Sequence, residues 1–250
     1  TTLIGADDKA GIAEIMTAIE KIIASDKPHG TVKISFTPDE EIGRGANHFD
    51  VEGFAADYAY TVDGGAIGEL EYENFNAAGA YIKVNGVSIH PGSAKDKMKN
   101  ASTIACEFNS MLPPDEVPEK TEGYEGFHHL SSISGGIEKA ELRYIIRDHD
   151  RTEFEAKKAR FAEIADALNK KYGEGTIELS VSDSYYNMKE LVQKEPKILE
   201  FATKALKENG LEPKFEAIRG GTDGARLSYE GILTPNLGTG GENFHGPYEY

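Results

Sequence analysis

The chain is poor in cysteine and in basic residues, and it has no tryptophan. Its one cysteine, Cys106, cannot form an intramolecular disulfide, which fits a reducing compartment. Because Cys106 lies in an apolar stretch with helical spacing, we expect a buried, unreactive thiol. The chain shows no secretory signal, and no apolar run approaches the roughly 20 residues that a transmembrane helix needs. These absences predict a cytoplasmic protein without a membrane-bound part.

Basic residues are outnumbered by acidic ones, with 27 Lys and Arg against 43 Asp and Glu and a formal net charge of −16. This charge repels nucleic acid phosphates and anionic lipids, and no Lys/Arg cluster compensates for it. We therefore expect neither nucleic acid nor a membrane as partner. The acidity alone could also serve only to keep the protein in solution.

The two ends of the chain carry an α/β pattern. Residues 1–4 read as a buried strand, and apolar residues between Ile12 and Ile23 recur at helical spacing. Further strands are predicted at 32–36 and 58–62, a helix at 196–209, and loops at 218–224 and 236–245. Strands that alternate with helices predict a mixed, mainly parallel sheet flanked by helices, with functional residues at the carboxyl ends of its strands.

The middle of the chain has a different pattern. Strands are predicted at 81–84, 130–134, 140–147 and 176–182, and helices at 96–111 and 152–172. This order predicts an inserted α+β sandwich of the ferredoxin-like kind over residues 76–185. Residues 1–75 and 186–250 would then form one discontinuous domain.

Several acidic residues follow predicted strands, namely Asp7, the pair Glu40 and Glu41, and Asp63. Taken singly, each could be a helix cap or a solvated loop acid. Together they would converge at one edge of the sheet, where a divalent cation relieves their repulsion. The glycine-rich loop around His245 can bring an imidazole to the same edge.

Carboxylates combined with a histidine suit zinc or a similar metal. Adjacent glutamates on an extended segment point in opposite directions, so only one of Glu40 and Glu41 needs to bind the metal. The other is free to act as general base toward a water molecule activated by the metal.

Six motifs, in this order, resemble the peptidase T family over essentially the whole chain. Those are tripeptide aminopeptidases in the clan of dinuclear zinc exopeptidases. The motifs are Gly5–Gly11 (GADDKAG), Thr37–Gly43 (TPDEEIG), Val62–Gly65 (VDGG), Ile89–Gly92 (IHPG), Arg219–Gly224 (RGGTDG) and Asn243–Gly246 (NFHG).

The resemblance implies a zinc exopeptidase-like catalytic domain with an inserted lid or dimerisation domain. It also implies that Asp7 bridges two zinc ions. Glu41 and His245 would bind one of these ions, and Asp63 would bind the other. Glu40 corresponds to the general base, which takes a proton from the attacking water and passes it to the leaving amine.

Further residues resemble substrate contacts of the family. His90 corresponds to a histidine that reaches the oxyanion, in related dimers from the neighbouring subunit; by itself it also reads as a turn histidine beside a proline. Arg147 and Arg219 correspond to groups that hold the peptide's carboxylate end, although Arg147 followed by Asp148 could form a structural ion pair. Asn187 resembles an asparagine that contacts the substrate.

The family's first motif, His-x-Asp on a strand that would precede this chain, is absent. It supplies one zinc ligand and the aspartate that orients the base. We therefore expect two zinc ions in a full-length subunit, one or fewer in this chain, and a chain that is inactive and poorly stable alone.

The leading prediction is a metallo-aminopeptidase that cleaves tripeptides and forms a possible homodimer through the inserted domain. A related zinc carboxypeptidase or N-acyl amino acid amidohydrolase is the first alternative. A non-enzymatic dimerisation or binding module is the second.

Overall fold

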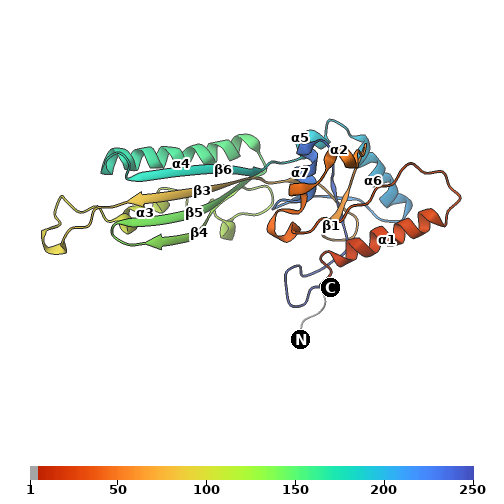
Figure 1. Cartoon of the computed structure of the whole chain (residues 1–250), viewed down its shortest axis with the longest axis horizontal. Helices are drawn as coiled ribbons and strands as arrows, with labels where there is room; N and C mark the ends of the chain where they lie inside the picture. The colour runs from red at the N-terminus through yellow and green to blue at the C-terminus, as the bar shows by residue number, and fades with distance from the viewer. Residues whose placement is uncertain (1–4) are drawn as a thin grey trace. The chain divides into compact units, whose positions relative to one another are not determined.

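The computed structural model describes residues 5–250, which divide into two compact units. The first unit combines the residues up to Asn74 with Asn187–Tyr250, and the second unit is Phe75–Tyr186. Figure 1 shows the elements of each unit coloured along the chain, with labels where there is room for them. The strand predicted at residues 1–4 lies outside the described residues.

The first unit contains a four-stranded sheet in the order β1-β8-β2-β7. Strand β1 (Thr61–Gly64) pairs in parallel with β8 (Asn236–Gly238), and β2 (Glu69–Asn74) pairs in parallel with β7 (Lys214–Ile218). Strands β2 and β8 pair antiparallel. The prediction of a mixed, mainly parallel sheet is confirmed.

Five α-helices belong to the described part of this unit: α1 (Lys9–Ile23), α2 (Val51–Phe54), α5 (Lys189–Val192), α6 (Lys197–Glu208) and α7 (Asp223–Glu230). A small buried cluster joins the last three through Met188, Val192, Ile198 and Ala225. Helix α1 has Gly11 as its one buried residue, and its apolar residues Ile12 and Met16 are 44% and 48% exposed.

The strand predicted at 32–36 is absent from the structure, so this prediction is wrong. Val32, Ile34 and Phe36 alternate as a strand would, yet the whole segment is exposed and has no regular secondary structure. A strand is held by hydrogen bonds to a neighbouring strand. Among the described residues none pairs with this segment, so the alternation alone does not produce a strand.

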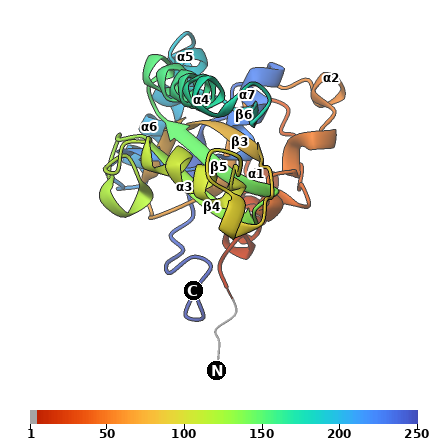
Figure 2. The ribbon, with the colours of Figure 1, turned by 90° about the vertical axis from the view of Figure 1, so that its left-hand side faces the viewer.

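The second unit contains an antiparallel sheet in the order β4-β5-β3-β6. Its strands are β3 (Asn76–Asn85), β4 (Phe127–Gly135), β5 (Lys139–Asp148) and β6 (Ile177–Tyr185). Helices α3 (Ala101–Ser110) and α4 (Arg151–Tyr172) complete it, and Figure 2 views these elements from the end of the sheet. The prediction of an α+β sandwich is confirmed.

The core of the second unit lies between its sheet and its two helices. Alternate residues of β5 are buried, and they meet the large side chains Phe108 of α3 and Phe154 and Phe161 of α4. Helix α3 buries Ala101, Ile104, Ala105 and Phe108, which share one face. Cys106 lies off this face and is exposed, so the expectation of a buried thiol is wrong.

Four short 3₁₀ helices complete the described structure: η1 (Glu40–Ile42), η2 (Gly45–His48), η3 (Pro91–Ser93) and η4 (Pro118–Lys120). Among the described residues, the structure contains no helix long and apolar enough to span a membrane.

Removing a large side chain from this core tests the packing of the second unit. Phe161 is 1% exposed, so Phe161→Ala leaves a cavity and should lower the free energy of unfolding of this unit by about 3–5 kcal/mol. Ile133→Ala on the same unit serves as control, because Ile133 is 48% exposed. Urea unfolding followed by circular dichroism measures both, and equal losses would contradict the described core.

Candidate metal centre

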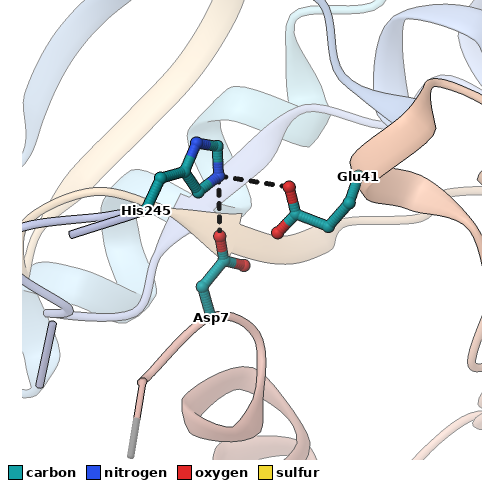
Figure 3. Close-up of side chains that lie close together, drawn as sticks. All are labelled: Asp7, Glu41 and His245. Carbon is teal, nitrogen blue, oxygen red and sulfur yellow. Dashed lines mark ion pairs between the residues drawn. The ribbon is translucent and has the colours of Figure 1, made fainter. Parts of the chain in front are cut away.

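Asp7, Glu41 and His245 meet on the first unit although they come from distant parts of the chain (Figure 3). One ligand atom of each lies within 4.8 Å of the others. The His245 Nε2 atom is 3.1 Å from Glu41 Oε2 and 3.5 Å from Asp7 Oδ2. The Asp7 side chain is mostly covered, whereas the other two are open to solvent.

The first turn of α1 places a second group beside this one. The Asp8 side chain caps the helix by accepting the Gly11 N–H at 3.1 Å. A Cβ atom on Gly11 would lie 2.0 Å from the Val62 carbonyl oxygen, so only glycine lets the helix start this close to β1. As a result Asp7, Asp8 and Asp63 each offer an oxygen within 4.8 Å of the others.

Glu40 and Glu41 lie in the tight turn η1, which is flanked by Asp39 and Gly43, both in the left-handed conformation. The two glutamates are therefore not on an extended segment. The expectation that their side chains point in opposite directions assumed extended backbone and loses its basis here. Glu41 contacts His245, while Glu40 is half-buried and does not belong to either group of ligand atoms.

Asp223, the first residue of α7, fixes the loop around this turn. Its carboxylate accepts the Thr37 hydroxyl and the Ala46 N–H, both at 3.1 Å. The two donors flank the Glu40–Glu41 turn in sequence. Asp223 thereby joins the turn to α7.

The C-terminal loop that carries His245 closes on itself. Glu242 and Tyr250 exchange backbone hydrogen bonds of 2.9 and 3.2 Å, and His245 has a φ of 58°. Left-handed backbone is unfavourable for a residue with a Cβ, so the surrounding loop must hold it in place. The Glu249 carboxylate accepts the His245 N–H at 2.9 Å and the Asp7 N–H at 2.8 Å.

The crowding of carboxylates raises their affinity for protons. Burial, together with the charges of Asp8, Glu40 and Asp7, raises the pKa of Asp63 to about 8. Burial also raises the pKa of Asp8 to about 6. The pKa of Glu40 is raised by burial and by the charges of Asp223, Glu41 and Asp7. The site therefore favours positive charge, either protons or a cation.

The donor set fits a metal ion that accepts both nitrogen and oxygen ligands. Two carboxylates and one imidazole are typical of zinc, and a protein site with three ligands leaves positions for water or substrate. Asp7 belongs to both groups, so a carboxylate with two oxygens stands between two possible cation positions. Nearby lies a cavity of about 1020 Å³ within the first unit, lined by Asp7, Glu40, Asp63 and apolar side chains of α1.

Two of the predicted substrate residues belong to the second unit. His90 is exposed, and its Nδ1 atom accepts the Gly92 N–H at 3.1 Å at the start of η3. Arg147 is part-buried near the end of β5, where it donates to the Ile146 carbonyl oxygen at 3.0 Å and its guanidinium lies 5.3 Å from the ring centroid of Tyr185.

The other two belong to the first unit. Asn187 is buried, and its side-chain oxygen accepts the N–H groups of Asn74 and Lys189 at 3.1 and 3.0 Å. Arg219 directly follows β7 and is part-buried. Neither residue belongs to the two groups of ligand atoms.

Three residues near the site were missed by the sequence reasoning: Asp8, Asp223 and Glu249. Asp8 and Asp223 lie inside motifs already singled out, where Asp8 caps α1 and Asp223 directly follows Thr222, the cap of α7. Glu249 carries no such signal, because its role depends on a contact with a residue 242 positions away.

Comparison with known proteins identifies relatives of this chain. The model of the peptidase dimerisation domain matches residues 72–176, and the model of M42 glutamyl aminopeptidases matches residues 4–106. A peptidase T from Clostridium perfringens is 63% identical over 100% of this chain. The chain spans 62% of the length of that relative.

Solved structures agree. An aminopeptidase PepT from Bacillus cereus is 28% identical, with a TM-score of 0.86 over 100% of this chain and 67% of its own. A tripeptidase from Staphylococcus aureus is 25% identical, also with a TM-score of 0.86, over 100% of this chain and 66% of its own. The YXEP protein from Bacillus subtilis, described as a dinuclear metal binding peptidase of the M20 family, shares the fold at 19% identity, with a TM-score of 0.63 over 86% of this chain and 58% of its own.

The fold and the dimerisation-domain match define a chain of the M20 peptidase type. Over its whole length it is similar to peptidase T proteins, which confirms the resemblance carried by the six motifs.

The raised pKa of Asp63 predicts how the stability of the metal-free chain depends on pH. The folded state keeps a proton on Asp63 up to about pH 8, whereas the unfolded state loses it near the ordinary value of 3.8. The unfolded state therefore binds fewer protons between these values, and stability falls as pH rises through this window.

Asp63→Asn, which cannot ionise, should flatten this fall and stabilise the metal-free chain at pH 8. Urea unfolding at pH 5 and pH 8 in the presence of a chelator measures the effect, with Asp26→Asn at an exposed position as control. If Asp63→Asn loses stability with pH as steeply as the unchanged chain, the prediction is contradicted.

Proposed function

We propose that the protein of which this chain forms part is a zinc-dependent aminopeptidase that releases the N-terminal residue of tripeptides. The observation that carries the proposal is the convergence of Asp7, Glu41 and His245 within 4.8 Å, next to a second group that shares Asp7. The family supports the substrate class, because its relatives include a peptidase T and a structure described as a tripeptidase.

The proposed ligands divide between two positions. Glu41 and His245 would hold one zinc ion, Asp63 would hold the other, and Asp7 would contribute a carboxylate oxygen to each. Bound zinc would polarise the scissile carbonyl and lower the pKa of a coordinated water. The repulsion among the carboxylates supports this assignment. Burial and this repulsion raise the pKa of Asp63, so that it retains a proton, and a bound cation would relieve the repulsion in place of that proton.

Glu40 is proposed as the general base. Its carboxylate is half-buried in the same turn as Glu41, so it stands one residue from a metal ligand without being one. A raised pKa brings a glutamate closer to the range in which it can both accept and return a proton. Glu40 would take the proton of the attacking water and deliver it to the departing amine.

Substrate binding is assigned to residues on both units. We propose that Arg219 and Arg147 pair with the carboxylate end of the peptide, that His90 stabilises the oxyanion, and that Asn187 contacts the substrate. The second unit, which carries the dimerisation-domain match, is proposed as the lid and homodimer interface. Residues 1–75 and 186–250 are proposed as the catalytic domain.

Activity is proposed for a protein of the relatives' length, since this chain spans 62% of one of them. The resemblance assigns one further zinc ligand and the aspartate that orients the base to a His-x-Asp motif ahead of Asp7. We therefore propose that the 250-residue chain alone is inactive, holds one zinc ion or fewer, and works in the cytoplasm only as part of the complete protein.

Metal content tests the ligand assignment on this chain. After equilibration with Zn²⁺ and removal of unbound metal, we expect about one zinc per chain. His245→Ala should fall well below this value, because one of three protein ligands is lost. His48→Ala, at an exposed histidine outside the site, should match the unchanged chain. Equal zinc content in all three proteins would exclude His245 as a ligand.

Peptide hydrolysis tests the reaction in the complete protein. We expect release of the N-terminal residue from a tripeptide and no cleavage of the same peptide with an acetylated amino end. Glu40→Gln should lower kcat by about 10²- to 10⁴-fold with the metal content unchanged. Cleavage of the acetylated peptide would instead indicate the carboxypeptidase or amidohydrolase alternative, and full activity of Glu40→Gln would exclude Glu40 as base.

A further inference from the structure

Glu249 is a buried carboxylate in the C-terminal loop, near the proposed metal site but outside both groups of ligand atoms. It is 8% exposed, whereas Glu242 of the same loop is exposed. No Lys or Arg of the described residues forms an ion pair with it. Its two oxygens instead accept one backbone N–H each, 2.8 Å from Asp7 and 2.9 Å from His245.

These two hydrogen bonds connect two of the three proposed ligands. Asp7 precedes α1 and His245 lies in the loop near the other end of the chain, and Figures 1 and 2 show the C-terminal loop beside the start of α1. Between the described residues of these two segments, the Glu249 carboxylate is a direct bridge. It fixes the backbone of both segments, and thereby the distance between the Asp7 and His245 side chains.

Gly5 makes room for this bridge. A Cβ atom at Gly5 would lie 2.2 Å from Glu249 Oε1, which is the oxygen that accepts the Asp7 N–H. Any larger residue at this position would displace the carboxylate from Asp7. The approach of Glu249 to the Asp7 segment therefore depends on a glycine there.

The hydrogen bond from the His245 N–H to Glu249 matters because His245 has a left-handed backbone conformation. His245 has a φ of 58°, a conformation that L residues adopt only when the surroundings hold them. The bond from its N–H to Glu249 Oε2 is one such restraint. Without it, we expect the loop to relax and the imidazole to leave Glu41 and Asp7.

We propose that Glu249 is a positioning residue of the metal site, which holds the Asp7 and His245 ligands at the separation that a shared metal ion requires. This inference rests on the proposed function, because it assumes that these residues bind the metal. Groups that orient metal ligands typically change metal affinity by about 10- to 100-fold when they are removed. Glu249 acts here through the backbone of the ligands and not through their side chains.

The test uses four variants of the chain and Co²⁺ as a spectroscopic probe of the site. Glu249→Ala removes both acceptors, and we expect its Co²⁺ affinity to fall about 10- to 100-fold. Glu249→Gln keeps one acceptor oxygen and should lie between this variant and the unchanged chain. Gly5→Ala displaces the carboxylate without removing it and should resemble Glu249→Ala. Glu242→Gln, at the exposed carboxylate of the same loop, is the matched control.

Two measurements separate positioning from a general loss of structure. The visible spectrum of bound Co²⁺ should change in Glu249→Ala, because the ligand geometry changes, while the far-ultraviolet circular dichroism stays the same. In the metal-free protein, amide hydrogen exchange of Asp7 and His245 should become faster in Glu249→Ala and in Gly5→Ala but not in Glu242→Gln. Combining Gly5→Ala with Glu249→Ala should add nothing further, because both act on one contact.

The outcomes distinguish this inference from the function on which it rests. An unchanged chain that takes up no Co²⁺ or Zn²⁺ would refute the metal site itself, and with it the role of Glu249. An unchanged chain that binds Co²⁺ with the same affinity and spectrum as Glu249→Ala would refute the role of Glu249 alone. Slower amide exchange or tighter Co²⁺ binding in Gly5→Ala would refute it as well.

Discussion

Mutual repulsion of carboxylates is the constraint on which the first unit depends. Asp7, Asp8, Asp63, Glu40 and Glu41 are brought together by a helix start, a strand and a tight turn. Among the described residues, the ion pairs of Asp7 and Glu41 are with His245, and no Lys or Arg pairs with the other three. A fold that keeps such groups together without basic partners must take up protons or cations. The raised pKa of Asp63 means that, without a cation, this carboxyl group retains a proton.

The loops that carry these groups are positioned by hydrogen bonds from backbone N–H groups to other carboxylates. Asp8 accepts from Gly11, Asp223 accepts from Ala46, and Glu249 accepts from Asp7 and His245. Such bonds are short-range and directional, so they fix loops that contain little regular secondary structure. The acidic composition thus has two uses within one unit, since some carboxylates are offered to a ligand and others hold the backbone.

The sequence predicted the second unit better than the first, for a physical reason. In the second unit each strand of the antiparallel sheet has described neighbours, so alternation of apolar residues in 140–147 corresponds to real burial in β5. In the first unit the same alternation at Val32, Ile34 and Phe36 has no strand to pair with among the described residues, and the segment stays exposed. Strand β8 was read as a loop, because its three residues lie among glycines and a threonine and show no period.

In the candidate site, the residues marked by local sequence motifs could be predicted, whereas the residue whose role depends on distant contacts could not. The motifs around Asp7, Glu41 and His245 were found because family resemblance marks each of them locally, and the structure brings the three side chains together. Glu249 was not found, because its contacts depend on how the loop between Glu242 and Tyr250 closes. The inference that Glu40 and Glu41 point apart was drawn from extended backbone, and the 3₁₀ turn there removes that premise.

Metal binding at the candidate site would be coupled to folding of the first unit. The candidate ligands come from three segments, and the Glu249 carboxylate joins the last segment to Asp7, which lies 242 positions away in the chain. Closing so long a loop costs conformational entropy, and α1 leaves apolar residues exposed instead of adding to the buried core. A cation bound by Asp7, Glu41 and His245 would join the same segments and favour the folded state by mass action. The second unit has its own continuous core and contributes none of these ligands, so its stability should not depend on the metal.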